Sequence, residues 1–498
     1  MTASTTPSSE PSSEPSSSEP PASPPSAVGL ARRRAVSGFT LYDVANSAFV
    51  TTVVTAVGGP FLTALAEDAA GPDGRVQVLL LNPRAESLFA YAVSLSVLLQ
   101  VLALPVLGAL ADRAAAKRQL LVVATVVGSA ATVVLALVPG SGVLLGLLAF
   151  VVANLAFGAA ILAYNAYLAE VAELPDRDRV SARGFAFGYA GGAFVLALSL
   201  ALVTAAEPLG FSRGTAVRLA IGLSAVWWAG LGMVAIRRLD AVQLLPGARP
   251  TGADSGQPDT VTPALGTQVA ATLRQMKGSF AALRALPGTA RYLLAFLLFN
   301  DAIQAVIALS AVVLENELFV AKGLPRDDAT PFLLQLILLI QVVAVFGAAG
   351  SARLAARIGA KRTLLLTLVV WIGIVVYAVG ALDSTGAAYV LGVFIAIVLG
   401  GSQALARSLF SSMTPAARQA SFFGFYELAE RGTAWIGTLI FAVVLDITGS
   451  YRSALLSLLV LFVSGGLLLA RTDTDAAIAA ARTADAVGDA AGDRTAPQ

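Results

Sequence analysis

Long runs of apolar residues are the feature of this sequence that most restricts its fold. A hydrocarbon layer about 30 Å thick needs roughly 20 apolar residues in helical conformation. Only 13% of the residues are charged, against about 25% in typical soluble proteins. The pattern predicts an all-α membrane protein with twelve transmembrane helices. Their expected ranges are 35–66, 86–111, 118–138, 143–170, 181–206, 215–236, 291–318, 331–357, 362–382, 386–412, 421–446 and 452–471.

The segments outside these runs give the domain organisation. Residues 237–290 divide the runs into two groups of six, 35–236 and 291–471. Residues 1–34 are rich in Ser, Pro and Glu and have too few apolar residues to form a core, so they are predicted to be a disordered cytoplasmic tail. They lack the features of a signal peptide. A second cytoplasmic tail is expected at 472–498. Within the central loop, 267–286 has the pattern of a basic amphipathic helix, either on the inner leaflet or in solvent.

The distribution of positive charge predicts the orientation. Most of the 33 lysine and arginine residues fall in segments that share a side with the amino terminus. Positively charged loops remain in the cytoplasm. Both termini are therefore expected to be cytoplasmic.

The chain contains neither cysteine nor histidine. Disulfides and thiolate metal sites are thereby excluded, and we expect neither a metal nor another cofactor. A net charge of +2 gives no reason to expect a nucleic-acid partner. Proton chemistry, if present, must use aspartate or glutamate, because histidine is the usual group that titrates near neutral pH.

A polar pair interrupts the first apolar run. Asp43 and Asn46 are three residues apart, and Asp43 lies ten residues after Arg33. In a helix this places Asp43 about 15 Å from Arg33, half of a hydrocarbon layer. A charge at this depth usually faces the bundle interior and serves a function. The alternative is a polar contact that holds two helices together.

The two groups of six runs carry matching segments. Asp301-x-x-Gln304 lies ten residues after Arg291, as Asp43-x-x-Asn46 does after Arg33. The segments 110–118 and 354–362 also match, in the loops after the second and eighth runs. Repeated halves around a central site are typical of secondary transporters.

The loop Gly108-x-Leu110-Ala111-Asp112-Arg113-x-x-x-Lys117-Arg118 resembles that of the major facilitator superfamily. The superfamily usually has a glycine three residues after the aspartate, and this position is Ala115 here. The matching segment 354–362 keeps the glycine, as Gly359, but has Ala356 in place of the aspartate. The resemblance implies that this loop latches the inner side of the first half shut. Alternatively, its basic residues only set orientation. The expected inner-gate residues are Gly108, Asp112, Arg113, Lys117, Arg118, Arg357, Lys361 and Arg362.

Five further segments resemble the branch of fungal autophagy-related vacuolar amino-acid effluxers and their bacterial relatives. They are LYDVANSAF (41–49), YNAYLAEVA (164–172), FLLFNDAIQAVIAL (296–309), GGSQALARSLF (400–410) and FFGFYELAERGTAWIGTLIF (422–441). The similarity extends from about 37 to 471. It implies transport of amino acids or similar small solutes. The alanine-rich composition and the absence of a compartment signal favour a bacterial plasma membrane.

Polar residues within the runs are the candidates for a substrate or ion pathway. They are Asp43, Asn46, Asn165, Asn300, Asp301, Gln304, Gln403, Glu427, Glu430 and Arg431. Carboxylates can bind an ammonium group and Arg431 a carboxylate, which suits a zwitterion. Alternatively, Glu427 and Arg431, four residues apart on one helix, neutralise each other. Gly184, Gly188, Gly191 and Gly192 permit either close packing or bending of the fifth run, and close packing is the favoured role.

These features predict a secondary-active transporter, not an enzyme, that uses alternating access around a site between two halves. Its expected partners are a small solute, the bilayer and a coupling proton or Na⁺, and we expect a monomer. Asp43, Asp301 and Glu430 are the candidate proton carriers. The alternatives are a non-transporting receptor or scaffold on the same fold and an aspartate-dependent lipid transferase.

Overall fold

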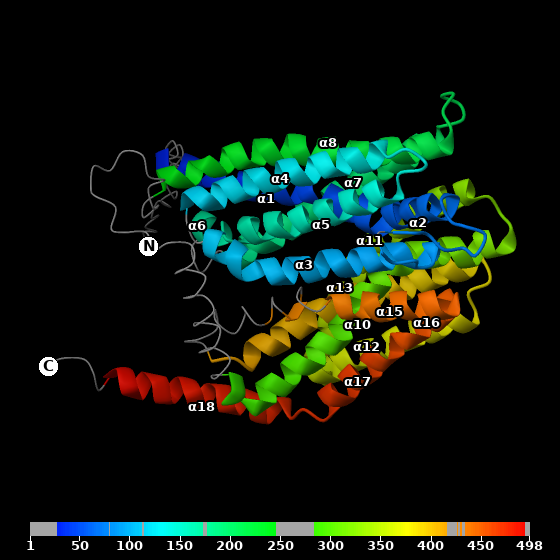
Figure 1. Cartoon of the computed structure of the whole chain (residues 1–498). Helices are drawn as coiled ribbons and strands as arrows, with labels where there is room; N and C mark the ends of the chain where they lie inside the picture. Colours follow the sequence, from blue (N-terminus) through cyan, green and yellow to red (C-terminus); the bar gives the residue numbers. More distant parts are fainter. Residues whose placement is uncertain are drawn as a thin grey trace, which may run out of the picture.

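In the computed structural model the chain is a bundle of helices (Figure 1). The structure describes residues 27–78, 80–111, 114–172, 177–245, 283–415, 426, 429–430 and 434–493. Helices α1 and α18 approach the same end of the bundle (Figure 1). We call this the inner end and the opposite one the outer end, after the orientation expected from the charge distribution.

The first half contains the elements that precede the central loop. They are α1 (Ala27–Ala48), the π-helical segment η1 (Phe49–Val57), α2 (Gly58–Asp68), η2 (Ala85–Ser87), α3 (Leu88–Ala111), α4 (Ala114–Leu137), α5 (Val143–Asn165), α6 (Leu168–Val171), α7 (Arg177–Thr204), α8 (Arg213–Leu239) and η4 (Asp240–Leu244). In the loop after α2, two isolated bridges, Arg75 with Arg84 and Val78 with Leu81, are the only strand-like pairing between described residues.

The second half follows the same plan. It contains α10 (Pro287–Leu318), η5 (Val320–Lys322), η6 (Arg326–Asp328), α11 (Ala329–Ile358), α12 (Ala360–Gly380), α13 (Thr385–Ser412), α15 (Ala434–Thr448), α16 (Tyr451–Ser457) and α17 (Leu459–Ala470). The terminal helix α18 (Thr474–Asp493) packs beside the start of α10.

Hydropathy predicted the spanning helices well. Eleven helices in the described part of the chain are long and apolar enough to cross a membrane, and Trp435–Thr448 is a shorter apolar helix in the position of the expected eleventh span. The predicted all-α fold of twelve spans is confirmed.

Two expected boundaries differ from the structure. Helix α1 begins at Ala27, inside the expected disordered head, because Ala31 and Ala35 are buried and the intervening arginines are good helix formers. Most of the expected 472–498 tail is helical in α18. The amphipathic helix expected at 267–286 lies outside the described residues except for its last turn.

The first span changes to π-helical geometry just after Asp43. Ser47 donates to the carbonyl oxygen of Asp43 (2.7 Å), and Thr51 donates to that of Ser47 (2.8 Å). Such bonds to the preceding turn disturb regular helix geometry. Pro60 has no N–H to continue the ladder, so α2 restarts at Gly58 with an α-helical pattern.

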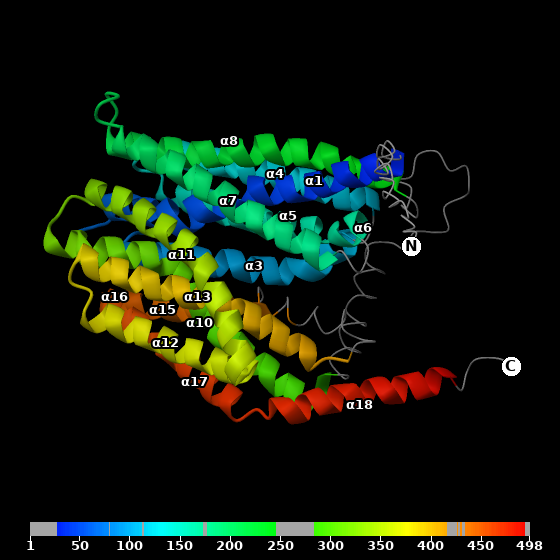
Figure 2. The same cartoon turned by 180° about the vertical axis from the view of Figure 1, so that it is seen from behind.

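Corresponding helices pack alike in the two halves. Helix α1 contacts α7 and α8, and α10 contacts α15 and α17. The halves meet where α3 contacts α15, α7 contacts α11, and η1 and α2 contact α10 (Figures 1 and 2). The first span of each half therefore lies between the remaining spans of its own half and the other half.

Glycines allow α7 to approach α1 closely. A Cβ added at Gly191 would lie 2.7 Å from Cγ1 and 3.0 Å from Cα of Val44, and one at Gly188 would lie 3.0 Å from Oγ of Ser47. One at Gly192 would meet Thr51 at 2.8 Å. The contacts confirm the expected packing role of this glycine stripe.

Replacing Gly191 with alanine is expected to lower the free energy of unfolding by about 1–3 kcal/mol, because the added methyl group meets backbone as well as side-chain atoms of α1. The midpoint of thermal unfolding in detergent measures the effect. Gly230→Ala is the matched control, since the space beside this glycine of α8 is open. Equal midpoints for the two variants would contradict close packing.

Candidate functional site

Asp43 is held by neutral groups of its own half. The hydroxyl of Tyr164, on α5, donates to Oδ2 of Asp43 at 2.8 Å. A Cβ added at Gly184 of α7 would lie 2.6 Å from the same oxygen, so this glycine leaves just enough space for the carboxyl group. No described cation forms an ion pair with Asp43.

An aromatic stack fixes the tyrosine that contacts Asp43. The ring of Tyr164 lies 4.3 Å from that of Phe39 at an interplanar angle of 21°, and 5.3 Å from that of Tyr42. Tyr42 is itself anchored by a 2.7 Å hydrogen bond to Thr125 of α4. Three helices thus set the direction of the Tyr164 hydroxyl.

The amides expected beside Asp43 occupy different environments. Asn46 is only 4% exposed and its side chain lies near the Asp43 carboxyl group, although its Nδ2 reaches no hydrogen-bond partner of good geometry among the described residues. Asn165 ends α5 and is exposed.

Asp301 occupies the equivalent position in the second half. It is 1% exposed, and its Oδ2 accepts a 2.8 Å hydrogen bond from the backbone N–H of Gly437 on α15. Its Oδ1 has no partner among the described residues. In each half, therefore, the carboxyl group lies between the first span and a glycine of the fifth span, Gly184 or Gly437.

The sequence predicts that Asp43 and Asp301 face one shared cavity. Each carboxyl group accepts its hydrogen bond from its own half, and neither lines the cavity described below. The shared cavity therefore stays a prediction, because residue spacing could not give the direction of the two side chains.

A second polar group lies near Asp301. Asn300 donates to the carbonyl oxygen of Glu430 at 3.2 Å, and the Glu430 carboxylate pairs with Arg407 of α13 at 3.3 Å. The Arg407 side chain is 46% exposed. Gln304 and Gln403 are half-buried, whereas Glu427 and Arg431 lie outside the described residues.

Three functional candidates were missed from the sequence. Arg407 lies within the expected run 386–412, one turn after Gln403, but is not among the expected pathway residues. Tyr164 precedes the expected Asn165 directly. Gly437 offers a backbone N–H, and no residue pattern marks such a donor.

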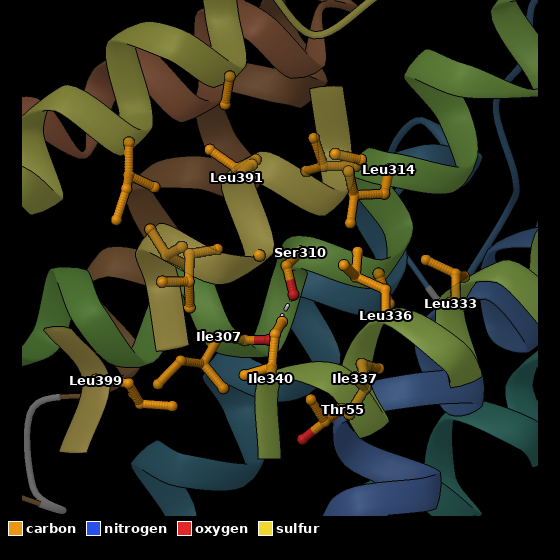
Figure 3. A pocket seen from close by; sticks show the side chains of 18 of the residues that line it. Thr55, Ile307, Ser310, Leu314, Leu333, Leu336, Ile337, Ile340, Leu391 and Leu399 are labelled. Carbon is orange, nitrogen blue, oxygen red and sulfur yellow. Dashed lines mark hydrogen bonds between the residues drawn. The ribbon is translucent and has the colours of Figure 1, made fainter. Parts of the chain in front are cut away.

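A cavity of about 200 Å³ lies mainly within the second half (Figure 3). Its walls are aliphatic residues of α10, α11, α12 and α13, such as Leu336 and Ile340. Thr51 and Thr55 of η1 and Tyr189 of α7 line it from the first half, so it reaches the contact between halves. Ser310 and Gln341 add polar groups, with the Ser310 hydroxyl turned to the carbonyl of Ile307 at 3.1 Å.

Basic residues of the inner loops bind within their own half. Lys117 is 3% exposed, pairs with Glu170 and lies 4.2 Å from the centre of the Tyr167 ring. Arg118 donates to both carboxylate oxygens of Asp240, at 2.7 and 3.0 Å. Lys361 donates to the carbonyl oxygens of Ala470 and Thr472.

The remaining expected gate residues give less detail. Arg357 and Arg362 are exposed, and Gly108 lies near the inner end of α3. Asp112 and Arg113 lie outside the described residues. The latch therefore stays a prediction.

Charged contacts join the two halves at the outer end. Between described residues, three ion pairs cross from one half to the other: Glu67 with Arg326, Arg213 with Asp328, and Arg75 with Asp446 at 3.7 Å. The backbone N–H of Arg84 also donates to Asp446 at 2.6 Å. These pairs hold the outer end closed, and sequence analysis did not identify them because the partners lie far apart in the sequence.

Solved structures with this arrangement of helices are transporters. The chain aligns with a D-xylose-proton symporter at a TM-score of 0.60 and 14% identity, over 90% of this chain and 98% of that one. It aligns with the nucleoside transporter NupG at a TM-score of 0.57 and 13% identity, over 90% and 98%. At this level of identity the likeness establishes the fold alone.

Sequence comparison gives the family. The chain is 28% identical over 448 residues to the uncharacterized MFS-type transporter YxiO of Bacillus subtilis (strain 168), covering 88% of this chain and 96% of the relative. It is 24% identical over 450 residues to autophagy-related protein 22 of Yarrowia lipolytica (strain CLIB 122 / E 150), covering 75% and 73%. The family model described as "Vacuole effluxer Atg22 like" matches residues 31–173 and 168–482. The chain therefore belongs to the vacuole effluxer Atg22-like family and has the major facilitator fold.

Proposed function

We propose that this protein is a secondary-active, proton-coupled transporter of small solutes, with amino acids as the solute class. The observation that carries the proposal is a pair of carboxyl groups at equivalent positions of two repeated halves, half-buried at Asp43 and buried at Asp301, each held by a neutral donor. Family membership supports transport, and the polar and apolar groups of the second half support the solute class.

Proton coupling is supported by the neighbours of the two carboxyl groups. Tyr164 and the Gly437 N–H are neutral donors, and no described cation forms an ion pair with either aspartate. An ionised carboxylate without a cation is costly in a low-dielectric interior, so binding a proton offsets that cost. Each carboxyl group can thus gain and lose a proton as its half moves.

The amino-acid assignment combines two features. The Arg407–Glu430 pair offers an arginine for a carboxylate and a carboxylate for an ammonium group. The cavity beside Ile340 is apolar and has a size that suits an aliphatic or aromatic side chain. A small zwitterion with an apolar side chain matches both.

We further propose that the protein works as a monomer in the cell membrane with both termini in the cytoplasm. The charge distribution supports this orientation.

Neutralising the carboxyl groups tests the coupling. Asp43→Asn and Asp301→Asn are each expected to reduce pH-driven uphill accumulation of amino acids in proteoliposomes to the level of empty liposomes, while downhill exchange continues. The reason is that asparagine cannot carry a proton. Asp383→Asn, an exposed aspartate at the outer end, is the charge-matched control and should transport normally.

Two results would contradict this mechanism. One is gradient-driven accumulation that persists in the Asp43→Asn, Asp301→Asn double variant. The other is accumulation that depends on Na⁺ and ignores pH, which would assign the coupling to a metal cation.

Narrowing the cavity tests the solute class. In the Ile340→Phe variant, amino acids with large apolar side chains are expected to compete for transport roughly ten-fold or more less strongly. The amino acid alanine should compete as before, because the wall of a pocket excludes side chains by their volume. Val369→Phe is the control, since Val369 of α12 is 63% exposed. Equal loss for large and small amino acids would oppose the assignment.

Cysteine labelling tests the orientation, because the chain has no cysteine of its own. Ser141→Cys, between α4 and α5, is expected to react with an impermeant maleimide on intact cells. Ala480→Cys, exposed on α18, is expected to react only after permeabilisation. The reverse pattern would overturn the topology.

A further inference from the structure

A group of titratable residues, two of them buried and three half-buried, lies across the junction of the two halves at the outer end. We name it the outer carboxyl cluster, and its members are Glu67 of α2, Glu86 of η2, Glu315 of α10, Arg326 of η6 and Tyr451 of α16. The first two belong to the first half and the other three to the second. Any separation of the halves at this end therefore divides the cluster.

Arg326 is the central cation of the cluster. Its Nη2 donates to Oε2 of Glu67 across the junction. Its Nη1 lies 3.8 Å from Oε2 of Glu315, too far for a hydrogen bond. Glu315 is 4% exposed, so its carboxylate is largely removed from bulk solvent. Glu86 lies within electrostatic range of both Glu67 and Arg326.

Several polar atoms of the cluster lack partners. Among the described residues, no hydrogen bond reaches Oε2 of Glu86, Nη1 of Arg326 or the hydroxyl of Tyr451, and all three atoms are buried. Tyr451 is only 3% exposed, and its hydroxyl lies within electrostatic range of all three glutamates. Buried polar atoms without partners are costly and indicate a position for a bound species.

The charge balance identifies the species. If every group were ionised, three carboxylates would face one guanidinium. Arg84 faces Glu86 and offsets one of these negative charges, whereas exposed Asp327 adds negative charge near Glu315. The neighbouring Arg452–Glu317 pair is neutral. The cluster therefore keeps an excess of negative charge in a partly buried place.

A proton suits this place better than a metal ion. No described set of three or more acidic side chains is arranged to hold a metal. A proton needs only one carboxylate oxygen. It converts that oxygen into a donor, which can serve the unpartnered acceptors nearby.

We propose that the outer carboxyl cluster is a proton-binding site that closes the outer end. One proton from the outer medium binds a carboxylate oxygen, chiefly on Glu315, when the halves meet there, and it returns to the outer medium when they separate. The site is distinct from Asp43 and Asp301 and acts whichever solute is carried.

The sign of the pH effect follows from proton linkage. In the closed state Glu67, Glu86 and Glu315 are gathered around Arg326, and Glu315 is buried, so we infer that the closed state binds one more proton than the open state. In the open state the first two glutamates move away with their half and all three are hydrated. Lower outer pH therefore favours closure, and the ratio of closed to open molecules changes by up to roughly ten-fold per pH unit.

The test measures the distance across the outer end without any solute. Spin labels are placed on the full chain at Ser141→Cys of the first half and Thr385→Cys of the second, both exposed positions. Distance distributions are recorded in nanodiscs from about pH 5 to about pH 8. We expect the short-distance population to grow as pH falls. Glu315→Gln, which mimics the protonated acid, should keep that population large throughout.

Two further variants separate an effect on the cluster from a general effect of removing a carboxylate or of poor folding. Glu317→Gln, two residues further along α10, removes a carboxylate outside the cluster and should leave the pH response intact. Glu86→Gln is a second cluster variant in case Glu315→Gln folds poorly, and it should flatten the response as well. A wild-type distribution unchanged across this pH range would overturn the proposal. So would an unaltered response in both cluster variants, or closure driven by Na⁺ at constant pH.

Discussion

A carboxyl group buried in a membrane protein must find its partners inside the protein, and this requirement organises both halves of the chain. Asp43 has the Tyr164 hydroxyl and Asp301 has the Gly437 N–H. The Tyr164 contact is made by the fourth span, and Gly184 of the fifth span leaves space for the Asp43 carboxyl group. In the second half the fifth span supplies the donor itself, at Gly437. An aspartate of the first span beside a glycine of the fifth span is therefore a contact used in both halves.

The two ends of the bundle differ in how they are held. At the outer end, ion pairs such as Glu67–Arg326 connect the halves. At the inner end, described basic residues such as Lys117 and Arg118 bind within a half and keep each half rigid. This distribution corresponds to a state closed toward the outside. Opening that end requires the cross-half pairs to break together, while the packing around each aspartate can persist.

Sequence reasoning succeeded for features that can be read along the chain. The lengths of the apolar runs predicted the spans, and the repeat placed Asp43 and Asp301 at equivalent positions of the two halves. It failed where direction or partner choice decides the outcome. Spacing could not show that each aspartate faces a glycine of its own half, and no pattern showed that Arg407 lies beside Glu430. The cross-half ion pairs join residues far apart in the sequence, so no local pattern marks them.

The central claim is that the carboxyl groups of Asp43 and Asp301 couple proton movement to solute movement. It is tested most directly by recording the pH inside proteoliposomes with an enclosed dye while an amino acid is added outside without a preset pH gradient. The account predicts a solute-dependent pH change in the wild type that is absent when Asp43 and Asp301 are both asparagine. Amino-acid uptake by the wild type with no accompanying pH change would contradict it.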